Sequence, residues 1–122
     1  MKNLIVGGSG FLGLKLAKTL LEKGESTAIT FSKNKPDLKD CKMIKVNITS
    51  TKEVSNAFKK TRPQKVFHLS ALTNVDVCEK EKKTARRLNV AGTQTVLEEC
   101  VKTGAKFLVD IYIKIGNLIF VV

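Results

Sequence analysis

The segment Val6-Gly7-Gly8-Ser9-Gly10-Phe11-Leu12-Gly13 joins a short apolar run, Leu4-Ile5-Val6, to a leucine-rich stretch that ends near Leu21. The apolar run is typical of a buried parallel strand, and the stretch after it predicts a helix over residues 10–21. Glycines recur at every third position of the segment, at Gly7, Gly10 and Gly13. Glycine there allows a tight turn, a close approach of the backbone to a pyrophosphate, and close packing of helix on strand. Because a helix N-terminus attracts phosphate, the segment predicts a turn that binds a dinucleotide.

Two other interpretations of this turn fit the residues less well. A P-loop requires a lysine directly after its last glycine, and here Leu14 follows Gly13. A glycine-rich turn that binds nothing does not require a strand before it and a helix after it, at the start of a β-α-β unit. We therefore expect a ligand-binding turn.

The rest of the chain predicts alternating strands and helices. Strands are expected at residues 26–31, 42–46, 65–70 and from 106 onward, and helices at residues 50–62 and 82–103. Ser50 and Glu53 form a capping box, and Arg62-Pro63 ends the helix that the box begins. The order predicts an α/β fold, a Rossmann-type doubly wound parallel sheet in a three-layer αβα arrangement, truncated after about the fifth strand.

Apolar spacing predicts the buried faces of the helices. In the first helix the better stripe consists of Leu12, Leu16 and Leu20. In the long helix the stripe consists of Ala85, Leu88, Gly92, Val96 and Cys100. Gly24 and Gly104 are expected to cap these two helices at their C-termini.

The residues after the second predicted strand bear on the choice of nucleotide. An NAD site places Asp or Glu at this point, on the 2′-hydroxyl of the ribose. Here no acid is present; Ser32 can donate a hydrogen bond to a 2′-phosphate, and Lys33 and Lys35 can neutralise it. This pattern favours NADP over NAD. The alternative is that the two lysines belong to a solvated basic loop.

Four segments of the chain form a specific combination. They are the glycine turn, Thr30-Phe31-Ser32-Lys33-Asn34-Lys35-Pro36, Val66-Phe67-His68-Leu69-Ser70-Ala71-Leu72-Thr73-Asn74-Val75-Asp76-Val77-Cys78-Glu79, and Leu88-Asn89-Val90-Ala91-Gly92-Thr93. Together they resemble the extended short-chain dehydrogenase/reductase class, which acts on nucleotide sugars, and within it the dTDP-4-dehydrorhamnose reductase group. The resemblance covers residues 1–108, so residues 1–122 are expected to form a single NADP-binding Rossmann domain with an atypical ending at residues 109–122.

The resemblance also implies roles for individual residues. It places the pyrophosphate and nearby ribose on Ser9, Gly10, Phe11 and Leu12. It places Asn47 and Ile48 beside the adenine, where the class commonly has Asp at position 47. It places the nicotinamide side along Leu69, Ser70, Ala71 and Thr73, with Asn89 ordering that region.

The resemblance stops before the catalytic residues of the class. A Ser/Thr, a Tyr-x-x-x-Lys pair and a sugar-binding lobe complete the site in that class, and this chain has none of them. Asp110 stands near the Ser/Thr position. Tyr112, the single tyrosine, is followed by Lys114 and is interpreted as a strand residue, though it is the one candidate for the acid. We expect cofactor binding with little or no catalysis by this chain alone, and a nucleotide-sugar substrate only with the missing lobe. A truncated or frameshifted gene would explain the ending.

The last residues are β-prone and surround Gly116-Asn117, a hairpin signal. We expect the fifth strand to continue into an extra strand. Apolar surface left uncovered by a missing lobe predicts self-association.

Composition excludes several classes of function. The chain has 122 residues and a net charge of +11, three cysteines and one histidine. Three scattered cysteines, Cys41, Cys78 and Cys100, predict free thiols rather than disulfides, and the sequence predicts no metal site. No apolar stretch is long enough to span a membrane, so a cytoplasmic protein is expected. His68 is interpreted as a packed strand residue.

Three functions remain open at this point. The first is an NADP-binding domain related to the nucleotide-sugar reductases, which transfer hydride to a 4-keto sugar. The second is a non-catalytic dinucleotide-binding or interaction module. The third is a basic nucleic-acid binder, which the lack of a binding motif and the aromatic content of 6% argue against.

Overall fold

The computed structural model describes residues 2–7, 11–69, 79–109, 112–115 and 118–121. Its elements are β1 (Lys2–Val6), α1 (Phe11–Glu22), β2 (Ser26–Phe31), β3 (Lys42–Lys45), α2 (Thr51–Thr61), β4 (Lys65–His68), α3 (Glu79–Thr103), β5 (Lys106–Val109), β6 (Tyr112–Ile115) and β7 (Leu118–Val121). The predicted order of strands and helices is confirmed through β5. Helix α3 begins three residues earlier than the sequence predicts.

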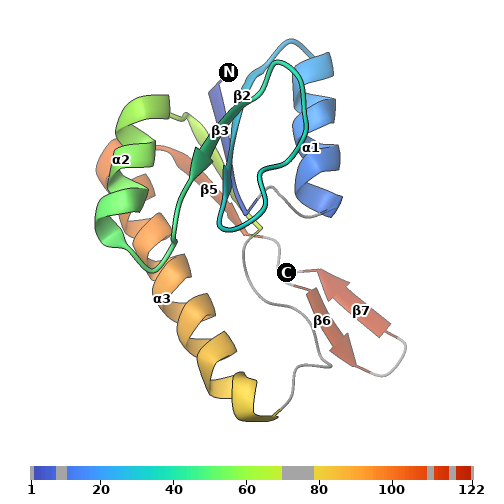
Figure 1. Ribbon diagram of the computed structural model, residues 1–122, viewed down its shortest axis with the longest axis vertical. Helices are drawn as coiled ribbons and strands as arrows, with labels where there is room; N and C mark the ends of the chain where they lie inside the picture. The colour runs from blue at the N-terminus through green and yellow to red at the C-terminus, as the bar shows by residue number, and fades with distance from the viewer. Residues whose placement is uncertain (1, 8–10, 70–78, 110–111, 116–117, 122) are drawn as a thin grey trace.

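Five strands form one parallel sheet in the order β3-β2-β1-β4-β5 (Figure 1). Strand β1 lies at its centre, where Leu4 is in register with Ala28 of β2 on one side and with Val66 of β4 on the other. The strand order reverses at β1, as it does in doubly wound Rossmann sheets. The predicted fold class is therefore confirmed.

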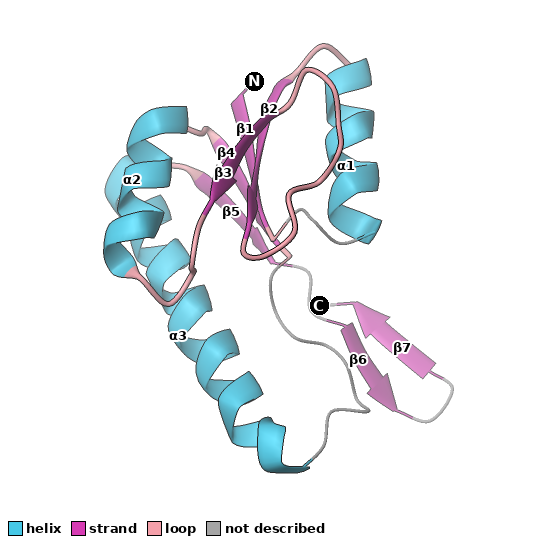
Figure 2. Ribbon diagram, in the orientation of Figure 1, coloured by secondary structure: helices cyan, strands magenta, loops and turns pink. Residues whose placement is uncertain are grey.

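Each face of the sheet has its own hydrophobic core. Figure 2 shows α1 on one side of the sheet and α2 and α3 on the other. On the α1 side, Ile5 and Ile29 pack with Ala17 and Leu20. The opposite side is larger and collects buried residues from β1, β2, β4, α2 and α3, among them Leu4, Val66, Phe58, Val96 and Cys100. Because strand residues alternate between faces, neighbouring residues such as Leu4 and Ile5 belong to different cores.

The buried face of α1 differs from the predicted stripe. Gly13, Ala17 and Leu20 are buried, at spacings of four and three residues. Leu16 is half-buried and Leu12 is 39% exposed, so the prediction is wrong at Leu12. Small side chains at Gly13 and Ala17 let the helix lie close to the strands, which turns Leu12 toward the edge of the interface. Leucine spacing alone does not distinguish the predicted face from this neighbouring face, because the helix is apolar on much of its surface.

The ends of the helices follow the predicted capping signals with one change. Ser50 Oγ accepts a hydrogen bond from the Glu53 backbone N–H at 3.3 Å, as expected. The Glu53 carboxylate accepts from the Asn47 N–H at 3.4 Å, because the Ser50 N–H already donates to the Asn47 carbonyl. The glycines after α1 and α3, Gly24 and Gly104, adopt φ of +80° and +76° and confirm the predicted caps.

The C-terminal strands form a sheet of their own. Strands β6 and β7 pair antiparallel, with Ile115 in register with Leu118, which confirms the hairpin signal at residues 116–117. The expected extra strand is present, but it does not extend the parallel sheet: β5 ends at Val109, and β6 and β7 pair with each other in a separate sheet.

Candidate functional site

Four candidate segments lie at one edge of the parallel sheet. Gly7, Ser32, Asn47 and Leu69 come directly or closely after β1, β2, β3 and β4. Backbone hydrogen bonds extend the sheet into these segments, from the Leu69 N–H to the Val6 carbonyl at 2.8 Å and from the Val46 N–H to the Phe31 carbonyl at 2.9 Å. In doubly wound folds this edge, at the point where the strand order reverses, holds the ligand.

Gly7 begins the glycine turn in a left-handed conformation. Its φ is +80°, which an L-residue with a side chain adopts only with strain. Its N–H donates to Thr30 Oγ1 at 3.1 Å, and Thr30 is buried in β2. The turn is therefore held to the neighbouring strand at its first residue. Sequence analysis missed this role of Thr30, because β2 carries several hydroxyl side chains and no local pattern pairs one of them with a backbone N–H 23 positions away.

The other predicted residues of the turn are described in part. Ser9 and Gly10 lie outside the described residues. Phe11 is the first residue of α1, Leu12 is exposed in its first turn, and Gly13 is buried. The N-terminus of α1 thus follows the turn directly, as a phosphate site requires.

The segment after β2 is basic and open to solvent. Ser32, Lys33 and Lys35 are all exposed, and the first acid along the chain is the exposed Asp37. None of the three exposed side chains makes a hydrogen bond or an ion pair with another described residue. They are free to meet a ligand at this edge.

Asn47 stands at the predicted adenine position and organises its own loop. Its Oδ1 accepts from the Thr49 N–H at 3.0 Å and from Thr49 Oγ1 at 2.6 Å. Both bonds use an acceptor oxygen, which the aspartate common in the class would supply equally well. The neutral amide avoids a second negative charge beside Glu53, whose carboxylate accepts from the Asn47 N–H.

Ile48 is held by a close approach of α3. A Cβ built on Gly92 would clash with Ile48 Cδ1 and lie 3.0 Å from its Cγ1. Gly92 is therefore needed for α3 to pack against the loop after β3. This contact explains the glycine in the predicted stripe of α3, of which Gly92, Val96 and Cys100 are buried. Ala85 and Leu88 have no described side-chain positions.

His68 ends β4 and is 1% exposed, which confirms a packed strand histidine. Its Nε2 lies 2.9 Å from Thr93 Oγ1 on α3, and its ring stacks on Phe107 at a centroid distance of 6.0 Å. Burial lowers the pKa of His68 to about 4, so the imidazole is neutral near pH 7. Sequence analysis gave no signal for the bond to Thr93, which joins residues 25 positions apart.

The predicted nicotinamide side is described only at its borders. Leu69 is half-buried, and Asn89 lies in α3 one turn before Thr93. Ser70, Ala71 and Thr73 lie outside the described residues, as does Asp110. Tyr112 begins β6, and its side chain is not described.

The two described cysteines are not arranged as nucleophiles or ligands. Cys41 and Cys100 are free, and burial raises the pKa of both thiols, that of Cys100 to about 11 with a contribution from the charge of Glu99. Cys78 lies outside the described residues. Within the described part of the chain, no cluster of His, Cys, Asp and Glu side chains could hold a metal ion. No helix there is long and apolar enough to cross a membrane.

Besides Leu12 of α1, large apolar side chains are exposed on α3 and on the edge strand β5. Val90, Leu97 and Val101 of α3 are 67%, 43% and 75% exposed, and Leu108 of β5 is 44% exposed. The three helical residues lie at spacings of seven and four, along one face of α3. The predicted self-association stays a prediction, and these are the described residues through which it would act.

Comparison with known proteins adds to this geometry. A family profile described as "RmlD substrate binding domain" matches residues 1–112. The chain is 30% identical over 107 residues to dTDP-4-dehydrorhamnose reductase of Aggregatibacter actinomycetemcomitans, covering 86% of this chain and 32% of that protein. It is 29% identical over 109 residues to dTDP-glucose 4,6-dehydratase of Haemophilus influenzae, covering 80% of this chain and 32% of that protein.

A solved structure shares the fold. The structure of UDP-glucose 4-epimerase of Thermus thermophilus, in complex with NAD, superposes with a TM-score of 0.80 at 28% identity, and covers 86% of this chain and 35% of the epimerase. The chain thus spans about a third of the length of each of these proteins.

Proposed function

The chain belongs to the RmlD substrate binding domain family, and from this premise we propose that it binds a nicotinamide dinucleotide at the carboxyl edge of its parallel sheet. The observation that carries the proposal is the left-handed Gly7, which follows the central strand and leads into the N-terminus of α1. The positive N-terminal end of α1 follows the central strand here, which is where a pyrophosphate binds in doubly wound sheets. The Thermus thermophilus epimerase, whose fold matches, was solved with NAD.

We assign the remaining predicted residues to the same site. Ser9, Gly10, Phe11 and Leu12 would hold the pyrophosphate and the nearby ribose, and Asn47 and Ile48 would border the adenine. Leu69, Ser70, Ala71 and Thr73 would line the nicotinamide side, beside Asn89. The buried His68 and the half-buried Thr93 hold β4 to α3 next to Leu69.

We propose that the preferred dinucleotide is NADP(H). Support comes from the exposed Ser32, Lys33 and Lys35 after β2 and from the absence of an acid before Asp37. A 2′-phosphate would meet a hydroxyl donor and two positive charges there.

The activity we propose is that of the nucleotide-sugar reductases, with dTDP-4-dehydrorhamnose reductase as the specific type. The bound dinucleotide supplies a hydride for the carbon of a 4-keto sugar. This chain holds and orients that dinucleotide. In the relatives, which are about three times as long, the sugar site would be completed by residues outside the part that matches this chain. Proton donation to the sugar oxygen is not assigned to any described side chain.

Calorimetric titration of the purified chain with NADPH and then NADH tests the proposal. Tighter binding of NADPH is expected, and loss of that preference is expected in Lys33→Gln/Lys35→Gln, because the 2′-phosphate then loses both charges. The matched control is Lys18→Gln/Lys52→Gln, which removes the same charge from exposed positions on α1 and α2. Absence of binding by either dinucleotide would overturn the proposed function. Oxidation of NADPH with a dTDP-4-keto sugar separates a reductase from a module that only binds the dinucleotide.

A further inference from the structure

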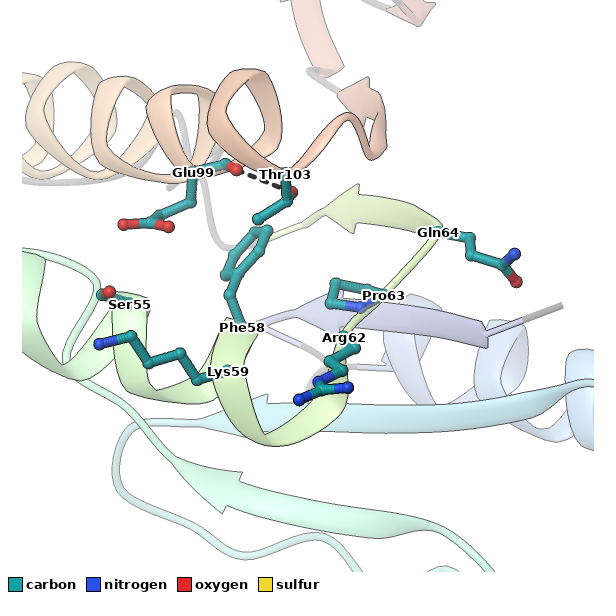
Figure 3. A pocket seen from close by; sticks show the side chains of 8 residues that line it. All are labelled: Ser55, Phe58, Lys59, Arg62, Pro63, Gln64, Glu99 and Thr103. Carbon is teal, nitrogen blue, oxygen red and sulfur yellow. Dashed lines mark hydrogen bonds between the residues drawn. The ribbon is translucent and has the colours of Figure 1, made fainter.

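A pocket lies at the edge of the sheet opposite the candidate dinucleotide site, between the C-terminal ends of α2 and α3 (Figure 3). Its volume is about 550 Å³, within the range of small-molecule sites. Arg62, Pro63 and Gln64, which line it, lead into the first residue of β4, so the pocket is separated from the glycine turn by the length of the strands. The candidate dinucleotide site does not use any of these residues.

The pocket contains a carboxylate that accepts no hydrogen bond from a described residue. Glu99 is 6% exposed, and the only charged partner of its side chain among the described residues is Lys102, whose Nζ lies 3.8 Å from Oε1. That distance is too long for a hydrogen bond, and the Lys102 side chain is 68% exposed, so the pair contributes little. The Glu99 oxygens are not among the buried atoms that lack a partner, so they are open to the pocket. Hydroxyl donors of a ligand in the pocket can therefore reach them.

The pocket also presents two cations without partners. Lys59 and Arg62 are exposed, and neither makes an ion pair or a side-chain hydrogen bond to another described residue. In Figure 3 the Glu99 carboxylate and the Lys59 ammonium extend to the same side of Phe58, whereas Arg62 and Gln64 lie on the other side. Phe58 and Pro63 are buried and form an apolar floor between these groups.

These groups together define the chemistry of a ligand. The Arg62 guanidinium, on one side of Phe58, can bind a phosphate through two parallel hydrogen bonds, while the Lys59 ammonium lies with Glu99 on the other side. A carboxylate and the Ser55 hydroxyl, which makes no hydrogen bond to another described residue, suit the hydroxyl groups of a polyol. Inorganic phosphate alone would leave most of the cavity and Glu99 unfilled. We propose that this pocket binds a phosphate ester that carries free hydroxyl groups.

The test is a titration followed by ¹⁵N chemical shifts, with glucose 1-phosphate, AMP and inorganic phosphate as separate probes. Shifts at Ser55, Gln64 and Thr103 are expected with one or both esters. The ester that binds more tightly shows whether the pocket prefers a sugar phosphate or a nucleotide. Because AMP resembles half of a dinucleotide, each titration is repeated in the presence of NADPH. Shifts confined to Gly7 and Ser32, or no shifts with either ester, would overturn the proposal without affecting the proposed dinucleotide site.

Three substitutions sharpen the test. Arg62→Gln is expected to weaken binding of the ester about tenfold, the usual effect of one hydrogen bond to a charged group. Glu99→Gln is expected to weaken binding of the esters by a similar factor but not binding of inorganic phosphate, because Glu99 lies on the side of the pocket assigned to the hydroxyl groups. Lys52→Gln is the matched control, because it removes a positive charge from an exposed position at the other end of α2, and it is expected to leave binding unchanged. Equal weakening by Arg62→Gln and Lys52→Gln would show general charge attraction and would overturn the proposed site.

Discussion

The imidazole Nε2 of His68 and the hydroxyl Oγ1 of Thr93 lie 2.9 Å apart and join the carboxyl end of β4 to α3. Both residues adjoin segments assigned to the nicotinamide side, since Leu69 follows His68 and Asn89 lies one helical turn before Thr93. The contact therefore sets the distance between the strand and the helix at the point where the proposed site begins.

Replacing Thr93 by valine should destabilise the fold by about 1–3 kcal/mol. The substitution keeps the shape of the side chain and removes the partner of a buried imidazole nitrogen. Urea unfolding measures the change in free energy. Thr95→Val is the control, because Thr95 Oγ1 bonds only to the Ala91 carbonyl of its own helix among the described residues, at 2.9 Å. Equal losses in the two variants would contradict the role of the His68–Thr93 contact.

The stability of the chain should fall as the pH drops below about 6.5. The pKa of His68 in the folded chain is about 4, so between these values the unfolded chain binds a proton that the folded chain does not. The loss should amount to roughly 2 kcal/mol between pH 7 and pH 5 and should end near pH 4. His68→Gln retains a group that can reach Thr93 but does not titrate. An identical pH dependence in this variant and in the wild type would refute the assignment.

The effect of Gly92→Ala on the free energy of unfolding should depend on the side chain at position 48. Alone, the substitution should destabilise the fold by about 1–3 kcal/mol, because the new Cβ clashes with Ile48 Cδ1. In an Ile48→Val background that methyl group is absent and only Cγ1, 3.0 Å from the new Cβ, remains close, so the better helix propensity of alanine, worth up to about 1 kcal/mol, should offset most of the cost. Thermal or urea unfolding of the four proteins gives the coupling energy directly. Additive effects would show that α3 does not approach this loop closely.

Gly7→Ala and Gly24→Ala should destabilise the fold by similar amounts, but they should differ in their effect on dinucleotide binding. Both glycines have φ of +80°, so each alanine carries about 1 kcal/mol of backbone strain. Gly24 has no atom within 4 Å of an added Cβ and lies at the end of α1 away from the proposed site. Dinucleotide binding, followed by calorimetry, should be lost in Gly7→Ala alone. Loss in both variants would indicate unfolding rather than a local effect.

Local signals predicted much of this fold because they act over short distances. The β-branched run at residues 26–31 gave the bounds of β2, and Gly24 and Gly104 marked two helix ends. The capping box was half right: Ser50 caps α2, but Glu53 bonds to Asn47, since β3 brings that residue within reach. Placing Leu12 in the packed stripe failed because the helix is apolar on much of its surface and the strands select the face with small residues.

The contacts that shape the candidate site depend on tertiary structure. Thr30 meets Gly7 across 23 positions, and Thr93 meets His68 across 25, so no local pattern indicates either bond. Gly92 was included in a packed stripe, but its reason, the approach of Ile48, requires the loop after β3 to be in place. Motif spacing therefore indicated the candidate site, and the parallel sheet determines which side chains support it.

The central position of β1 also affects how the chain emerges from a ribosome. Strand β1 is synthesised before both of its partners, and one of its edges must wait for β4, about 60 residues later. At synthesis rates of roughly 5–20 residues per second, that edge stays unpaired for about 3–12 s, while β2 can already protect the other. Leu4, Ile5 and Val6, buried on both faces in the finished fold, spend that interval on an open strand. The segment that organises the mature sheet is thus the part of the nascent chain most in need of shielding by a chaperone.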